Sequence, residues 1–124
     1  MKFWAVMLLG LLAGLLVSCA EEGNPAEAVE QYFQAQVNAD ADAMRGVLCS
    51  ELEAELSIRA NSFAGLDVEL RDMECSAGDV QNNTSTVTCD GLIFVNYGTE
   101  ASELPLTSYR AVREDGEWKM CGEA

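Results

Sequence analysis

The spacing of apolar residues changes at Leu66, and this change restricts the fold more than any other feature of the chain. Before Leu66, apolar residues recur every three or four positions, as on one face of a helix. From Leu66 onward they alternate with polar residues, as in a strand with one buried face. Helices followed by strands predict an α+β fold in which the helices cover one face of an antiparallel sheet.

Three segments before Leu66 begin with a residue that can cap a helix, and in two of them an acidic residue follows three positions later. These segments begin at Asn24, Asp40 and Ser50. The first predicts the longest helix, which ends near Asn38. Ser50 and Glu53 have the spacing of a capping box, and we expect one or two helical turns after them.

The alternating pattern from Leu66 to the end of the sequence predicts a four-stranded antiparallel meander. The strands are expected from Leu66 to Cys75, from Thr84 to Tyr97, from Leu104 to Arg113 and from Glu117 to Cys121. The alternation in the first strand slips near Arg71-Asp72, which predicts a β-bulge. A three-residue loop around Asp115-Gly116 would place Val112 opposite Trp118, so we expect Trp118 to be buried.

The first 18 residues have the pattern of an export signal. Lys2 precedes 15 mostly apolar residues, from Phe3 to Val17, whereas a membrane-spanning helix needs about 20. The run ends at Leu16-Val17-Ser18-Cys19, which resembles the lipobox of bacterial lipoproteins, where the cysteine is acylated and becomes the first residue. An uncleaved anchor or simple secretion is the alternative.

This resemblance implies a division into three parts and a location. Residues 1–18 would be a signal peptide, residues 19–23 a short lipid-anchored tether, and residues 24–124 a single domain. The protein would be exported and attached to a bacterial membrane, facing the periplasm or the cell exterior. Which membrane it occupies, and its oligomeric state, do not follow from the sequence.

The charge of the mature chain limits its partners. Without residues 1–18 the chain has 21 acidic and six basic residues, a net charge of −15. This excludes nucleic acid, whose phosphates need clustered Lys and Arg. Attachment to a membrane should therefore depend on acyl chains rather than on a basic patch. A basic partner or loosely bound cations remain compatible with such a surface.

Four cysteines lie in the domain: Cys49, Cys75, Cys89 and Cys121. An even number in an exported small domain predicts two disulfides, with three possible connectivities. Cys75 and Cys89 flank a polar Asn82-Asn83 turn, which favours a cross-strand pair and leaves Cys49 for Cys121. With no CxxC pair and no histidine in the sequence, we expect neither a zinc site nor a cofactor.

Two segments resemble one superfamily. PAEAVEQYFQAQVNADADAMRGVLCSE (residues 25–51) is similar to the first helix and following break of the nuclear-transport-factor-2-like superfamily, which has a cystatin-like α+β roll. YRAVREDGEWKMC (residues 109–121) resembles its last hairpin. The whole chain is similar to small bacterial lipoproteins of unknown function built on this roll. The resemblance implies the roll fold and gives little indication of an activity.

Enzymes of this superfamily, such as ketosteroid isomerase and the polyketide cyclases, use Asp, Tyr or His in the pocket as acid and base. The resemblance implies one such pair here, Tyr32 with Asp40 or Asp42. Packing of Tyr32 with Phe33 and helix capping by Asp40 explain these residues more simply. Four other aromatic residues either line a pocket or form the core: Phe94, Tyr97, Tyr109 and Trp118.

We therefore expect a non-catalytic binding or accessory domain that takes a small apolar ligand or an envelope protein partner. A small isomerase-type or cyclase-type enzyme is the alternative. A tyrosine and a carboxylate that converge in a closed pocket would favour the enzyme. The identity of the ligand or partner does not follow from the sequence.

The lipid anchor is testable by one substitution. Cys19→Ala should abolish incorporation of radiolabelled palmitate and release the protein from membranes, because the thiol that carries the lipid is removed. A variant that is still labelled and still sediments with membranes would contradict the assignment.

Overall fold

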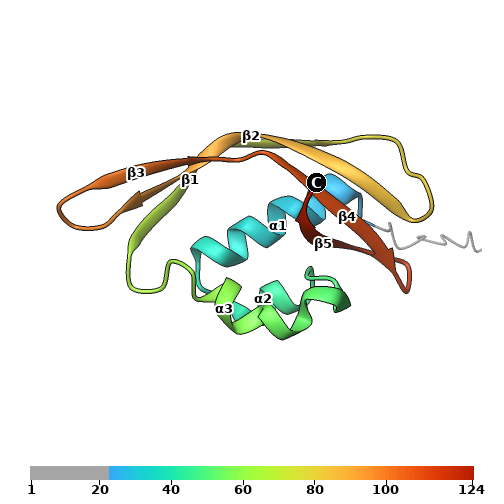
Figure 1. Ribbon diagram of the computed structural model, residues 1–124, viewed down its shortest axis with the longest axis horizontal. Coiled ribbons are helices and arrows are strands. Elements are labelled where there is room, and N and C mark those ends of the chain that lie inside the picture. The colour runs from blue at the N-terminus through green and yellow to red at the C-terminus, as the bar shows by residue number, and fades with distance from the viewer. Residues whose placement is uncertain (1–22) are drawn as a thin grey trace, which may run out of the picture.

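The computed structural model describes residues 23–124, which form a curved antiparallel sheet with the helices on its concave side (Figure 1). The helical elements are α1 (Pro25–Val37), α2 (Ala41–Arg45), the 3-10 helix η1 (Ser50–Glu55) and α3 (Leu56–Ala60). The strands are β1 (Asp67–Ala77), β2 (Thr84–Asn96), β3 (Ala101–Pro105), β4 (Ser108–Glu114) and β5 (Glu117–Glu123). The predicted change from helices to strands at Leu66 is confirmed. Cys19 and the signal segment lie outside the described residues.

Two of the three predicted helix caps are confirmed. Asn24 Oδ1 accepts the Glu27 N–H at 2.8 Å, and Asp40 Oδ1 accepts the Ala43 N–H at 3.0 Å. The capping box at Ser50 is wrong: η1 begins at that residue without a side-chain cap. The Ser50 N–H and hydroxyl instead donate to the carboxylate of Glu114 in β4, at 3.1 and 3.0 Å. This long-range acceptor replaces the local one.

Helices α1, α2 and α3 are all short. None of the helices within residues 23–124 is long and apolar enough to cross a membrane.

The sheet has five strands rather than the predicted four. Its order is β1-β2-β4-β5. β3 pairs with the C-terminal part of β2, from Leu92 to Asn96. The predicted strand from Leu104 to Arg113 is divided after Pro105, which has no N–H to donate to a ladder. Across the break, Leu106 N–H donates to Gly91 O at 3.0 Å, so the antiparallel meander continues with an irregularity.

The predicted bulge in β1 is confirmed and coincides with a close approach of backbones. The β1–β2 register shifts between Arg71 and Glu74, and Asp72 has a φ of 53°. Opposite the bulge, Gly91 has a φ of 99°, and a Cβ atom there would lie 2.6 Å from the carbonyl oxygens of Arg71 and Asp72. Glycine is therefore required at position 91.

The last hairpin has a different register from the predicted one. Its loop contains two residues, Asp115 (φ 51°) and Gly116 (φ 82°), as in a type I′ turn. Arg113 therefore pairs with Trp118, and the predicted pairing of Val112 with Trp118 is wrong. Trp118 is nevertheless buried, as predicted.

The core lies between α1 and the concave face of the sheet. Tyr109 and Trp118 belong to it, and the rings of Tyr32, Phe33 and Tyr109 pack edge to face with centroid distances of 5.0 and 4.9 Å. Phe94 lies on the opposite face of β2, where the Arg71 guanidinium stacks 3.8 Å from its ring centroid. Tyr97 is half-exposed. The interior of the roll is thus filled by side chains.

The structure contains two disulfides, Cys49–Cys121 and Cys75–Cys89, the pairs that the sequence analysis favours. Cys75 and Cys89 are direct partners in the β1–β2 register. Cys49 ends a segment that follows the edge of β5, where Met120 N–H donates to Val47 O at 2.7 Å. In the chain-entropy model, closing a loop of 72 residues stabilises the fold by about 4 kcal/mol.

Peptide mapping without reduction should recover Cys49 with Cys121 and Cys75 with Cys89. Only this pairing is compatible with the β1–β2 register and with the contact between residues 47–49 and β5. A major peptide that links Cys49 to Cys75, or Cys89 to Cys121, would contradict it.

The close approach at Gly91 gives a second prediction with a matched control. Gly65 also has a positive φ, of 79°, but a Cβ atom there would meet nothing within 4 Å. Gly65→Ala should lower the free energy of unfolding by about 1–2 kcal/mol, the cost of the backbone conformation alone. Gly91→Ala should lower it by at least about 3 kcal/mol because two carbonyls must also move. Equal losses in urea unfolding would contradict this account.

Candidate ligand-binding site

A cavity of about 290 Å³ lies where α1, α3, β4 and β5 meet. Its walls are formed by Tyr32, Phe33, Gln36, Arg59, Tyr109, Met120, Gly122 and Glu123. Other depressions on the described part of the chain have similar volumes, from about 210 to 310 Å³. Size therefore does not distinguish this cavity. It is distinguished by the buried polar groups that converge on it.

Tyr32 is the most buried of these groups, with an exposed fraction of 2%. Its position on the inward face of α1 follows from the helical spacing that also buries Val29 and Phe33. The Tyr32 hydroxyl accepts a hydrogen bond from Arg59 Nη1 at 2.9 Å. Burial raises the pKa of Tyr32 above its ordinary value, and the Arg59 hydrogen bond opposes that rise only in part.

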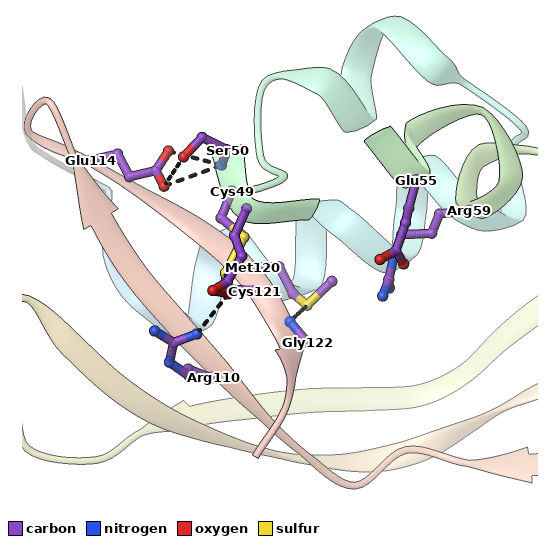
Figure 2. Close-up of a disulfide and its surroundings, with 10 residues drawn as sticks. Cys49, Ser50, Glu55, Arg59, Arg110, Glu114, Met120, Cys121 and Gly122 are labelled. Carbon is purple, nitrogen blue, oxygen red and sulfur yellow. Dashed lines mark hydrogen bonds and ion pairs between the residues drawn. A yellow bond between two sulfur atoms is a disulfide. The ribbon is translucent and has the colours of Figure 1, made fainter. Parts of the chain in front are cut away.

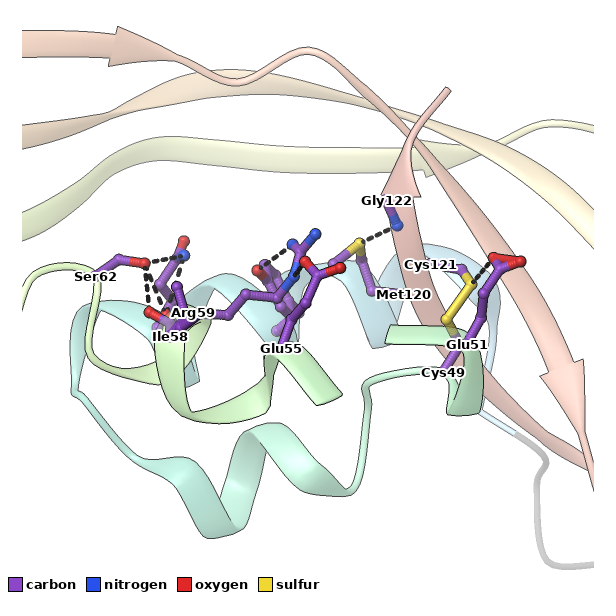
Figure 3. A network of polar contacts seen from close by, with 11 residues as sticks. Cys49, Glu51, Glu55, Ile58, Arg59, Ser62, Met120, Cys121 and Gly122 are labelled. Carbon is purple, nitrogen blue, oxygen red and sulfur yellow. Dashed lines mark hydrogen bonds and ion pairs between the residues drawn. A yellow bond between two sulfur atoms is a disulfide. The ribbon is translucent and has the colours of Figure 1, made fainter. Parts of the chain in front are cut away.

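Arg59 connects Tyr32 to a carboxylate. Its Nε donates to Glu55 Oε1 at 2.9 Å, one helical turn earlier, and Figure 3 shows the two side chains together. The Arg59 side chain is 26% exposed and that of Glu55 is 49% exposed. The network therefore runs from the buried phenol to the solvent at the mouth of the cavity.

Gln36 fixes α1 to the end of α3 and so holds Arg59 in place. Its Nε2 donates to the carbonyl oxygen of Arg59 and to Ser62 Oγ, both at 3.3 Å. Ser62 Oγ also donates to the same carbonyl oxygen, at 3.0 Å. Figure 3 shows Ser62 beside Arg59. Both the backbone carbonyl and the guanidinium of Arg59 are therefore held by hydrogen bonds.

The structure does not bring Asp40 or Asp42 to Tyr32 as a catalytic pair. Asp40 caps α2, and Asp42 is exposed and forms an ion pair with Arg45 at 2.7 Å. Both carboxylates have local donors within α2, which explains their positions. The carboxylate that is connected to Tyr32, through Arg59, is Glu55. The sequence analysis missed this residue, although the four-residue spacing of Glu55 and Arg59 was a usable signal.

Cys49, Glu51 and Cys121 are the one cluster of three potential metal ligands within residues 23–124. Figure 3 shows their arrangement. The distance from Cys121 Sγ to Glu51 Oε2 is 3.5 Å. Since both sulfur atoms belong to a disulfide, Cys121 Sγ has no hydrogen to donate, and the approach is a contact rather than a hydrogen bond. Neither cysteine provides a thiolate for a metal ion.

The fold is similar to that of solved structures. One is a candidate ketosteroid isomerase from Shewanella frigidimarina NCIMB 400, with a TM-score of 0.54 and 13% sequence identity over 81% of this chain and 93% of that one. Another is a candidate dehydratase of the NTF2-like family from Streptomyces avermitilis, with a TM-score of 0.51 and 14% identity over 79% and 92%. No family model and no curated protein matches the sequence. The chain has the NTF2-like α+β roll fold, as the resemblance predicted.

The raised pKa of Tyr32 predicts a dependence of stability on pH. The native state holds this proton more tightly than the unfolded chain, in which tyrosine titrates near pH 10. The resulting stability is complete below about pH 10 and is lost as the pH rises through the native pKa, by about 1.4 kcal/mol per pH unit. Between about pH 10 and 11, wild type should lose more free energy of unfolding than Tyr32→Phe. Parallel losses in the two proteins would contradict this prediction.

Proposed function

We propose that this protein is an exported, lipid-anchored envelope protein whose domain binds a small ligand and does not catalyse a reaction. The pattern that ends at Cys19 supports the anchor and the export. The two disulfides within residues 23–124 support an oxidising compartment. In this proposal the lipid on Cys19 inserts into the membrane. The ligand binds in the cavity beside Tyr32.

The pairing of Tyr32 with Arg59 is the observation that carries the proposal for binding. A proton-transfer enzyme needs a base within hydrogen-bond reach of the reacting group. Here the phenol oxygen accepts from a guanidinium, and the nearby carboxylate of Glu55 is bonded to that guanidinium. A network of this kind presents fixed donors to a bound molecule, while burial keeps the phenol protonated.

The packing of the roll also favours a small ligand at the cavity mouth. Tyr32, Phe33 and Tyr109 occupy the interior and are each at most 7% exposed. A large apolar molecule would have to displace these rings, whereas a molecule of about ten heavy atoms needs only the existing cavity of about 290 Å³. The apolar part of such a ligand would contact Phe33 and Met120.

Binding can be observed through the methionine methyl groups. After removal of the signal segment the chain has three methionines: Met44, Met73 and Met120. Only Met120 lines the cavity. The mature protein in nanodiscs, labelled with ¹³C-methyl methionine, therefore contains two internal controls. Within a panel of small organic molecules, those that bind should shift the Met120 methyl signal and leave that of Met73 in place. A panel without any selective Met120 shift would contradict the proposed site.

The enzymatic alternative is tested on the same sample. An enolisable ketone in D₂O should exchange its α-hydrogens at the buffer rate, because no base is hydrogen-bonded to Tyr32 among the described residues. Exchange accelerated by wild type and abolished by Tyr32→Phe would show that the domain is an enzyme.

A further inference from the structure

Arg59 and Tyr32 bring several hydrogen-bond donors to the cavity. A guanidinium has five N–H groups, of which Arg59 uses one for Glu55 and one for Tyr32. Three N–H groups on its terminal nitrogens are left. Tyr32 acts as an acceptor toward Arg59, and its own O–H donates to no other group among residues 23–124. Because Tyr32 lines the cavity, this O–H is available to a ligand that accepts a hydrogen bond.

The guanidinium of Arg59 favours a carboxylate over a neutral acceptor. Arg59 is the one basic residue in the walls, and hydrogen bonds to a charged acceptor are about twice as strong as neutral ones. A carboxylate has two oxygens, which match the guanidinium N–H groups together with the phenol. A phosphate would bring nearly two negative charges into a domain that is already strongly acidic.

We infer that the ligand is a small monocarboxylate with an apolar body, whose carboxylate is bound by Arg59 and the Tyr32 hydroxyl. This inference rests on the proposed binding function. The apolar body lies against Phe33 and Met120, and the cavity of about 290 Å³ accommodates a molecule the size of benzoate or hexanoate.

Two carboxylates oppose the ligand. Glu55 occupies Nε of Arg59, and Glu123 lies in the wall on the exposed side. Since Glu55 is about half exposed, solvent screens its repulsion in part. Removing the Glu55 charge therefore weakens this repulsion and the attraction that holds Arg59 to Glu55. A variant without this charge is expected to bind the ligand more tightly.

The test uses benzoate and its neutral isostere benzamide as probes. Each is titrated into the mature protein in zwitterionic nanodiscs and followed by the Met120 methyl signal. Benzoate should bind at least about tenfold more tightly than benzamide. Tyr32→Phe and Arg59→Gln should each weaken benzoate at least about tenfold and change benzamide less than about threefold. Glu55→Gln should strengthen benzoate severalfold. Arg45→Gln, which breaks the exposed ion pair with Asp42, is the matched control and should change neither.

The outcomes separate this inference from the proposed function. If benzamide or other neutral molecules shift Met120 as strongly as benzoate, the domain binds ligands but the carboxylate class is wrong. If Arg59→Gln leaves benzoate affinity unchanged, or Glu55→Gln lowers it, the assigned recognition pair is wrong. If no molecule shifts Met120, the proposed function fails as well. Tyr32→Phe keeps the packed ring, so this variant tests the hydroxyl even if Arg59→Gln is unstable.

Discussion

The fold depends on the close contact between Gly91 and the bulge in β1. Two backbone carbonyls occupy the space where a side chain at position 91 would lie. The bulge at Asp72 and the positive φ of Gly91 bend β1 and β2 at the same level, and a bulge increases the local twist of a sheet. Figure 1 shows the result: the long strands arch over α1, so that one helix covers much of the concave face.

This curvature leaves three sheet edges to be protected. Residues 47–49 follow the edge of β5, and the Cys49–Cys121 disulfide fastens them there (Figure 2). The edge strand β1 is interrupted by its bulge, and Glu30 of α1 accepts the Cys75 N–H at 3.0 Å. β3 is short and ends at Pro105. These features are typical of edges that do not pair with other chains.

The charge distribution gives the cavity its character. Among the described residues, an ion pair with an acidic residue is formed by each of Arg45, Arg59, Arg71, Arg110 and Lys119. Arg113 donates to Asn83 Oδ1 at 2.9 Å. Four of these ion pairs have mostly exposed carboxylates and contribute little to stability. Arg59 differs because its other partner is the phenol of Tyr32, which is only 2% exposed. It thus combines a fixed position with unused donors.

Features that depend on near neighbours in the chain could be predicted from the sequence. The caps at Asn24 and Asp40, the change of period at Leu66 and the slip at Arg71-Asp72 are all local and are all confirmed. The tertiary structure decided what depends on contacts between distant segments. Ser50 donates to Glu114, 64 residues away, instead of capping its own helix. Tyr32 receives its hydrogen bond from Arg59, 27 residues away, rather than pairing with an aspartate near the end of α1. A side chain takes the partner that the packed chain brings within reach, and no spacing in the sequence encodes that distance.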